Sequence, residues 1–359
     1  MATLDDLPLR DDLRGSNPYG APEISVPVAL NLNENPNQIP QQVAREVVEG
    51  LAEALGRSNR YPDRDFPELR QAFSKYLGNG LNAEQLWAAN GSNEVLFQVL
   101  LAFGGPGRTA LGFGPSYSMY PILARTAFTN WREEPRGSDF SLDPVAVASA
   151  ISAHKPDVVF LCSPNNPTGT PLSLETIEAA YEAATGIVVV DEAYAEFAPA
   201  QFESALQLLP GRERLLVCRT MSKAFAFAGV RVGYLAADPA VVAALKLVRL
   251  PYHLSVLTQV AAITALAHVD QMLESVQLVV AQRERILSTL PSLGFPVSES
   301  WANFVLFGGL EDPKSTFGAL LEQGILIRDV GIANHLRVTA GTEAEVDLFL
   351  DSISKLRQQ

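Results

Sequence analysis

The sequence is poor in cysteine and histidine. Its two cysteines, Cys162 and Cys218, lie far apart and form no Cys-x-x-Cys pair, and its four histidines are scattered singly. A disulfide framework or a structural metal site needs several such residues at short, regular spacings. We therefore expect neither a disulfide framework nor a bound metal.

Long apolar segments are also missing. No uncharged apolar run approaches the roughly 20 residues that a membrane-spanning helix requires. The first residues include two acids, at Asp5 and Asp6, where a secretory signal would carry basic residues. We expect a cytoplasmic protein without a membrane segment.

Basic residues are outnumbered, with 27 Lys and Arg against 40 Asp and Glu, which gives a formal net charge of −13. Such a balance disfavours binding to nucleic acid or to an anionic membrane. Any anionic ligand must then be held by a few local arginines and backbone amides.

What the chain does contain is an alternation of helical patterns with short apolar runs. It has 359 residues, of which 47% are hydrophobic. Val43, Val47, Leu51 and Leu55 recur every four positions and predict an amphipathic helix over residues 41–55. The runs at 157–162, 187–190 and 215–217 are typical of central strands that are buried on both faces. This alternation predicts an α/β fold with a mostly parallel central sheet flanked by helices.

The pattern changes near residue 240 and predicts two domains. Long helices are expected at 239–249 and from 258 to about 290, then a strand at 304–307 and a helix from residue 343. We expect a large domain over residues 31–240 and a smaller α+β domain over 241–359. Residues 1–30, rich in Pro and Gly, are expected to form an arm that packs on the smaller domain.

Polar residues follow the ends of the three predicted central strands, at 163–169, 191–194 and 219–223. In open α/β sheets, ligands bind outside the carboxyl ends of the strands. All three segments therefore predict one common site.

Two of these residues suggest a particular chemistry. Asp191 ends a buried strand, where a carboxylate is costly unless it meets a cation such as a pyridinium nitrogen. Lys223 taken alone would be read as a surface lysine, but a lysine desolvated beside Arg231 can lose its proton and attack an aldehyde. Together they suit a ligand that carries a pyridinium nitrogen and an aldehyde, as pyridoxal 5′-phosphate (PLP) does.

Other segments fit this prediction, although each has an ordinary structural reading. Asn166 lies in a stiff Asn-Pro turn, and Tyr194 offers a phenol. Ser92 or Asn93 is expected to cap a helix over 95–103, whose free amide groups would cradle a phosphate. A plain loop and a plain helix cap are the alternatives.

The joint order and spacing of these segments resemble the fold type I aminotransferases over nearly the whole chain. The motifs are Tyr-Pro-Asp at 61–63, Gly-Ser-Asn-Glu at 91–94, Gly-Pro-Ser-Tyr-Ser-Met-Tyr at 114–120, Ser-Pro-Asn-Asn-Pro-Thr-Gly at 163–169, Asp-Glu-Ala-Tyr at 191–194, Ser-Lys at 222–223 and Gly-Val-Arg-Val-Gly at 229–233.

The resemblance implies a role for each matching residue. Lys223 would bind PLP covalently and move the substrate's α-proton, and Asp191 would keep the ring nitrogen protonated so that the ring can accept electrons. Asn166 and Tyr194 would hydrogen-bond the ring hydroxyl, with Tyr194 also in the catalytic set. Further cofactor contacts are implied for Tyr117, which would stack on the ring, and for Gly91, Ser92, Asn93, Ser222 and Arg231 around the phosphate. Tyr61 would reach that phosphate from the neighbouring subunit, so a homodimer is implied.

Within this superfamily the chain most resembles the histidinol-phosphate aminotransferases. The similarity lies in Pro-Tyr-Gly-Ala-Pro at 18–22, Asn-Leu-Asn-Glu-Asn-Pro at 31–36, Tyr-Pro-Asp-Arg at 61–64, and the segments 324–328 and 336–342. The chain departs from the family at Glu23, where the family often has glycine.

This resemblance implies amino transfer between histidinol phosphate and 2-oxoglutarate, with glutamate as a product, in histidine biosynthesis. Candidate substrate-binding residues are Tyr19, Asn93, Tyr252, Arg328 and Arg337. Arg337 and Arg328 suit both carboxylate and phosphate, because a guanidinium can pair with either in bidentate fashion. For Tyr252 and Asn93, packing and helix capping remain alternatives.

Three other functions compete with this one. An aromatic amino acid aminotransferase shares the scaffold and differs in the side-chain pocket. A PLP-dependent decarboxylase of a phosphorylated amino acid would present a carboxylate to the ring in place of a Cα–H bond. A PLP-binding regulatory domain is disfavoured, because no basic helix-turn-helix segment precedes residue 30.

Overall fold

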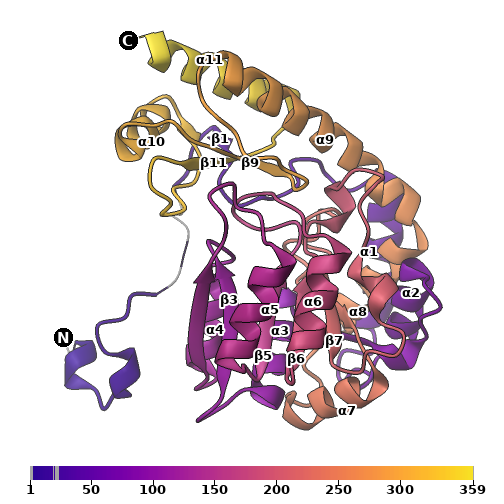
Figure 1. Cartoon of the computed structure of the whole chain (residues 1–359). Coiled ribbons are helices and arrows are strands. Elements are labelled where there is room, and N and C mark those ends of the chain that lie inside the picture. Colours follow the sequence, from indigo (N-terminus) through magenta and orange to yellow (C-terminus); the bar gives the residue numbers. More distant parts are fainter. Residues whose placement is uncertain (1–2, 19, 21–23, 359) are drawn as a thin grey trace.

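The computed structural model describes residues 3–18, 20 and 24–358, and its centre is a seven-stranded sheet (Figure 1). The strand order is β2-β8-β7-β6-β5-β3-β4. All neighbours are parallel except β8, which is antiparallel to both β2 and β7. The expected mostly parallel α/β sheet is confirmed. Its strands are β2 (Leu86–Ala89), β3 (Thr109–Gly114), β4 (Asn130–Pro135), β5 (Val158–Cys162), β6 (Ile187–Asp191), β7 (Leu215–Thr220) and β8 (Gly233–Ala236).

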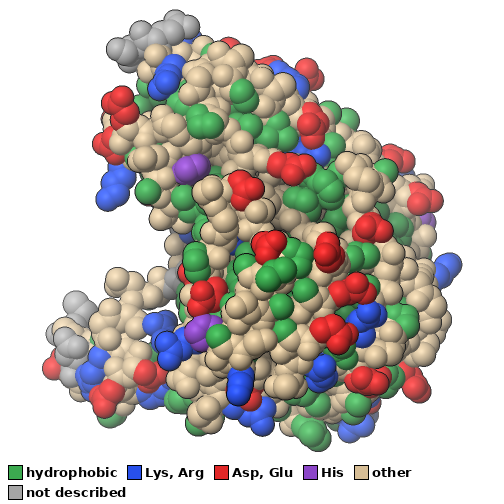
Figure 2. Space-filling model, viewed as in Figure 1, with side chains coloured by type: hydrophobic (Ala, Val, Ile, Leu, Met, Phe, Trp, Pro, Cys, Tyr) green, Lys and Arg blue, Asp and Glu red, His purple; other side chains and the backbone are tan. Residues whose placement is uncertain are grey.

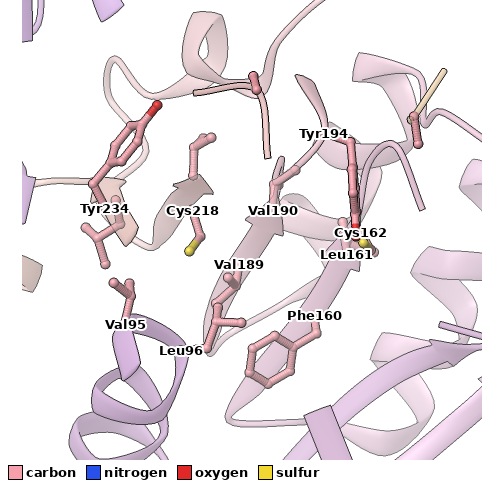
Figure 3. Close-up of a cluster of buried hydrophobic side chains, with 14 of the residues drawn as sticks. Val95, Leu96, Phe160, Leu161, Cys162, Val189, Val190, Tyr194, Cys218 and Tyr234 are labelled. Carbon is pink, nitrogen blue, oxygen red and sulfur yellow. The ribbon is translucent and has the colours of Figure 1, made fainter. Parts of the chain in front are cut away.

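The three predicted central strands are β5, β6 and β7, and every residue in them is buried. Their Val, Leu and Ile side chains pack on both faces of the sheet, as expected for parallel strands covered by helices. Figure 3 shows Phe160 and Leu161 of β5 beside Val189 and Val190 of β6 in this core. Because the three strands share this core, they end at the same edge of the sheet.

Helices flank the sheet. α5 and α6 pack on each other in front of the strands in Figure 1, and α3 packs on β7 and β8. The helices are α1 (Gln41–Leu55), α2 (Pro67–Leu77), α3 (Ser92–Phe103), α4 (Met119–Thr126), α5 (Pro144–His154), α6 (Leu174–Ala183), α7 (Pro239–Val248), α8 (Val256–Ala267), α9 (Val269–Ser292), α10 (Pro313–Glu322) and α11 (Glu343–Gln358).

The predicted helix from 258 to about 290 is wrong as a single element. The backbone leaves the helical region at His268, and α8 and α9 meet there at a bend of 80°. α8 packs on α1, and the His268 ring lies 2.6 Å from Glu46 of α1. Tertiary packing therefore breaks a helical pattern that the local sequence would continue.

The C-terminal part carries two small sheets. β9 (Phe304–Phe307) pairs antiparallel with β11 (Leu336–Thr339), and β1 (Val28–Ala29) pairs parallel with β10 (Ile325–Leu326). α9 and α11 run side by side over them (Figure 1). The N-terminal residues 28–30 thus contact the C-terminal part of the chain.

The expected domain limits at residues 30 and 240 stay predictions. Residues 28–30 contact the C-terminal part, whereas the Arg10 guanidinium lies 3.9 Å over the ring of Phe128, next to α4. Arg125 of α4 also donates to Ser16 at 3.2 Å. The N-terminal segment therefore makes contacts in both parts of the molecule.

Two further findings concern the described residues only. No single helix among residues 3–18, 20 and 24–358 is long and apolar enough to cross a membrane; α8 and α9 meet the length and composition requirement only together. Within the same ranges, no three His, Cys, Asp or Glu side chains group to hold a metal ion. Acidic side chains are spread over the face shown in Figure 2, with Lys and Arg between them.

Candidate active site

A cavity opens at the carboxyl ends of β5, β6 and β7, where the sequence predicts a common site. It collects most of the residues expected to bind the cofactor. The lining residues are Ser92, Asn93, Tyr117, Cys162, Asn166, Asp191, Ala193, Tyr194, Thr220, Ser222, Lys223 and Arg231.

Asp191 ends β6 at the floor of this cavity. Its carboxylate accepts hydrogen bonds from the Tyr120 hydroxyl at 2.9 Å and from the Ala193 amide at 3.2 Å. Among the described residues no Lys, Arg or His forms an ion pair with it. Burial raises the pKa of Asp191 to about 6, because an unpaired carboxylate is poorly solvated there.

Lys223 follows β7 and reaches across the cavity, where its Nζ donates to the Leu32 carbonyl at 3.0 Å. Burial lowers its pKa to about 8, and the positive charges of Arg337 and Arg231 add to this effect. The lowered pKa gives the amine a larger neutral fraction near neutral pH than an exposed lysine has, and the neutral amine carries a lone pair that can attack a carbonyl.

An anion cradle lies at the N-terminus of α3. The expected cap at Ser92 or Asn93 is wrong: the cap position is Gly91, at a φ of 88°, and the Ser92 and Asn93 side chains line the cavity instead. Arg231 forms the other side of the cradle and donates to Ser222 Oγ at 3.3 Å.

The Arg231 guanidinium closely approaches Gly91, and the backbone of Ser92 closely approaches Gly233, which explains the two glycines of this cradle. A Cβ at Gly91 would lie 2.3 Å from Arg231 Nη2, and one at Gly233 would lie 2.1 Å from the Ser92 amide nitrogen. Arg231 itself has a left-handed φ of 62°, which is uncommon for a residue with a side chain and is found at constrained sites. The cradle therefore depends on both glycines.

The side wall of the cavity is aromatic. Tyr117 donates to Asn93 Oδ1 at 3.1 Å, and its ring packs edge-on against Tyr120 at 5.4 Å. Tyr120 in turn stacks on Phe160 at 4.8 Å. This packing holds a flat aromatic face at the cavity.

Polar side chains form the opposite wall. The Tyr194 hydroxyl accepts from Asn166 Nδ2 at 3.3 Å and from Asn33 Nδ2 at 3.0 Å. Arg337 of β11 donates to Asn166 Oδ1 at 2.6 Å and to the Asn31 carbonyl at 2.8 Å. Residues from both ends of the chain thus meet at the loop after β5.

A second cavity adjoins the first and shares Tyr117, Asn166, Tyr194 and Lys223 with it. Arg328 and Arg337 both line this second cavity. Their backbones form an antiparallel bridge, with reciprocal amide-to-carbonyl hydrogen bonds of 2.9 Å. The two predicted anion-binding arginines therefore lie side by side next to the proposed cofactor position.

Three predicted site residues among those described, Gly91, Tyr61 and Tyr252, do not line these cavities. Tyr61 is 80% exposed, and its ring stacks on that of Tyr252 at 4.5 Å. Tyr252 is itself 40% exposed. Tyr19 lies outside the described residues.

Sequence reasoning missed several residues of the site. Tyr120 and Asn33 were visible only as members of motifs, without a role of their own. Cys162, Ala193 and Thr220 also line the cavity. Tyr120 could have been found from its spacing of three from Tyr117 at the start of a helix, since such residues share a helix face.

The chain is similar to known proteins over nearly its whole length. The model of the family described as "Aminotransferase class I and II" matches residues 26–353. The histidinol-phosphate aminotransferase of Paenarthrobacter aurescens (strain TC1) is 54% identical, with 99% of this chain and 96% of the relative covered. That of Thermobifida fusca (strain YX) is 55% identical, with 98% and 96% covered.

A solved structure shares the fold. The histidinol-phosphate aminotransferase of Sinorhizobium meliloti, in complex with pyridoxal 5′-phosphate, superimposes with a TM-score of 0.83 at 24% identity. The match covers 93% of this chain and 91% of that one. It supports the fold assignment independently of close sequence similarity.

Proposed function

Because this chain belongs to the class I and II aminotransferase family, a PLP-dependent family, we propose that it transfers an amino group between histidinol phosphate and 2-oxoglutarate. The observation that carries this proposal is the 54–55% identity, over nearly the full length, to relatives named for that activity. The reaction gives imidazole-acetol phosphate and glutamate, a step of histidine biosynthesis. A cytoplasmic location stays a prediction.

The residues of the first cavity fit PLP. Asp191 is a buried carboxylate without a cation among the described residues, and a protonated pyridine nitrogen would supply one. The phosphate suits the cradle of Ser92, Ser222 and Arg231, where a guanidinium and helix amides converge. Tyr117 offers a face for the ring, and Asn166 and Tyr194 offer partners for its hydroxyl.

When bound, PLP supplies an electron sink for the electron pair left on the substrate's α-carbon. Asp191 would keep a proton on the ring nitrogen, because a charged carboxylate stabilises a cation beside it. Lys223 would hold the cofactor, and its Nζ would accept the substrate's α-proton. Its lowered pKa of about 8 suits both the attack and the proton transfer.

We further propose Arg337 as the anion anchor for both substrates. Histidinol phosphate carries a phosphate and no carboxylate, whereas glutamate carries two carboxylates, so one site must accept both groups. Arg337 is buried, and its guanidinium is fixed by Asn166 and the Asn31 carbonyl, which orients it for bidentate pairing. Arg328 lies beside it, and Tyr19, Asn93 and Tyr252 remain proposed contacts of the substrate's other end.

The test of this function is a panel of amino donors with 2-oxoglutarate. Purified, PLP-loaded protein should form glutamate from histidinol phosphate at least ~10-fold faster, in kcat/KM, than from phenylalanine, as expected when one charged contact separates two substrates. Lys223→Ala is the matched control and should form none. Equal use of phenylalanine would identify an aromatic aminotransferase instead, and release of carbon dioxide would identify a decarboxylase.

We also propose a homodimer in which Tyr61 reaches the phosphate of the partner's cofactor. Tyr61, Tyr252, Leu247 and Leu250 are exposed apolar side chains on neighbouring segments, which is typical of an interface. Mixing inactive Lys223→Ala subunits with impaired Tyr61→Phe subunits should restore activity, since one site of each heterodimer keeps both residues. No recovery in heterodimers verified by mass would discard the shared site.

A further inference from the structure

Asn33 is buried at the junction of three chain segments and has no role in the function proposed above. Its exposed fraction is 2%, and its backbone is left-handed, with a φ of 55°. Asn303 donates to its carbonyl oxygen at 3.0 Å. Its side chain lies between Thr339 of β11 and the Tyr194 hydroxyl. It therefore links the C-terminal part of the chain to a wall of the cofactor cavity.

The hydrogen bonds around Thr339 fix the orientation of the Asn33 side-chain amide. The Asn33 backbone N–H donates to Thr339 Oγ1 at 3.1 Å, so this oxygen acts as an acceptor there. Its own proton is then donated to Asn33 Oδ1, also at 3.1 Å. Because Oδ1 faces Thr339, the Nδ2 group must face Tyr194 and can only donate to it.

Asn166 is oriented by the same kind of argument. Arg337 can only donate, and its Nη1 lies 2.6 Å from Asn166 Oδ1. The Asn166 Nδ2 group consequently faces the Tyr194 hydroxyl, 3.3 Å away. Two amide groups therefore donate to a single phenol oxygen.

A phenol has one proton to donate and accepts through its oxygen lone pairs. Asn33 and Asn166 both use the oxygen as an acceptor, which leaves the proton for a third partner. We propose that Asn33 is a positioning residue that, together with Asn166, makes the Tyr194 hydroxyl donate its proton to the ring oxygen of PLP. This inference rests on the function proposed above.

A donated proton stabilises negative charge on that ring oxygen, so the nitrogen of the PLP–Lys223 linkage releases its own proton at a lower pH. The pH at which the bound cofactor changes colour therefore reports the direction of the Tyr194 hydrogen bond. This readout does not depend on turnover. A residue with a merely structural role would leave it unchanged.

The decisive variant is Asn33→Asp. Aspartate tolerates the left-handed backbone and keeps the acceptor for Thr339, but it offers Tyr194 an oxygen in place of an N–H. The Tyr194 proton should turn towards this carboxylate. We expect the absorbance midpoint of the PLP-loaded protein to rise by about one pH unit and the dissociation constant for PLP to rise roughly tenfold, as for the loss of one charge-assisted hydrogen bond.

Asn35→Asp is the matched control. It adds the same charge in the same segment, but the Asn35 side chain contacts Ala224, Ser275 and Asn37 rather than Tyr194. Its midpoint should stay at the wild-type value. In a Tyr194→Phe background, Asn33→Asp should add little further shift. An Asn33→Asp protein with a wild-type midpoint, or a full shift in that background, would overturn the inference.

Thr339→Val tests the same orientation if Asn33→Asp does not fold. It removes the hydroxyl that orients Asn33, whereas Thr339→Ser keeps it, so only the valine variant should raise the midpoint. Equal midpoints in the two variants would overturn the inference. A wild-type protein that fails to bind PLP would instead contradict the proposed function, so the two failures are distinguishable.

Discussion

Asp191 and Glu192 are adjacent carboxylates at the end of β6, and they differ in whether a basic side chain balances their charge. Glu192 Oε2 accepts from Arg219 Nη2 and from Ser204 Oγ, each at 2.7 Å, and its Oε1 accepts from the Ala205 amide, also at 2.7 Å. Asp191 has a phenol and one amide as partners and no described cation. Successive side chains of a strand point to opposite faces, which places the two carboxylates in different surroundings.

The contrast separates a carboxylate that is paired within the chain from one that we propose binds the cofactor. The Glu192–Arg219 pair joins the ends of β6 and β7, the strands that carry Asp191 and lead to Lys223. Its charge is balanced within the chain. Burial instead raises the pKa of Asp191, because the buried carboxylate is poorly solvated and no Lys, Arg or His of the described residues forms an ion pair with it. A buried charge that the fold leaves incompletely paired marks a ligand position.

The largest expected effect comes from breaking the ion pair between Glu192 and Arg219. Glu192→Ala leaves the buried Arg219 guanidinium with the Ser204 hydroxyl and, among the described carboxylates, the more distant Glu196, 3.6 Å from its Nη1. We expect the free energy of unfolding to fall by about 3–5 kcal/mol, as when one partner of a buried pair is removed. Urea denaturation of the protein without PLP measures it. A loss below ~1 kcal/mol, the scale of a surface pair, would show that the pair is not structural.

A smaller effect on stability, of opposite sign, is expected from replacing Asp191. The pKa of Asp191 is raised to about 6 from its ordinary 3.8, so between these pH values the unfolded chain loses this proton before the folded one. Stability of the protein without PLP should therefore fall as pH rises through this window. Asp191→Asn lacks that loss and should be more stable than wild type by about 2–3 kcal/mol above the window.

Denaturation of wild type and of Asp191→Asn in parallel from pH 4 to 7 isolates the contribution of the Asp191 carboxylate, since the two proteins share all other titratable groups. The stability difference should be near zero at the acid end and should grow with pH. A difference that does not depend on pH would mean that Asp191 titrates normally in the folded protein. The comparison between the two carboxylates would then lose its basis.

Much of the framework could be predicted from local pattern. The helix over residues 41–55, the strand over 304–307 and the C-terminal helix from residue 343 have the predicted limits. Residues that follow buried strands were placed correctly in the cavity, because parallel strands end at one edge of the sheet. Hydrophobic periodicity and the ends of apolar runs can be read from short stretches of the sequence.

The parts that could not be predicted depend on partners far away in the chain. Asn33 is oriented by Thr339, 306 positions later, and Tyr120 donates to Asp191, 71 positions later. The break at His268 is likewise associated with α1, which begins at Gln41. No local propensity marks these residues. The role proposed for Asn33 follows only from the direction of each hydrogen bond around it.

The cradle at the start of α3 has a consequence for how the protein is made. Its walls come from Ser92, Ser222 and Arg231, and Gly233 packs against the amide of Ser92. In a growing chain the proposed phosphate site is therefore incomplete until residue 233 has left the ribosome. Arg337 and Thr339 follow about a hundred residues later, close to the final helix. The proposed PLP pocket is thus one of the last features that translation can complete.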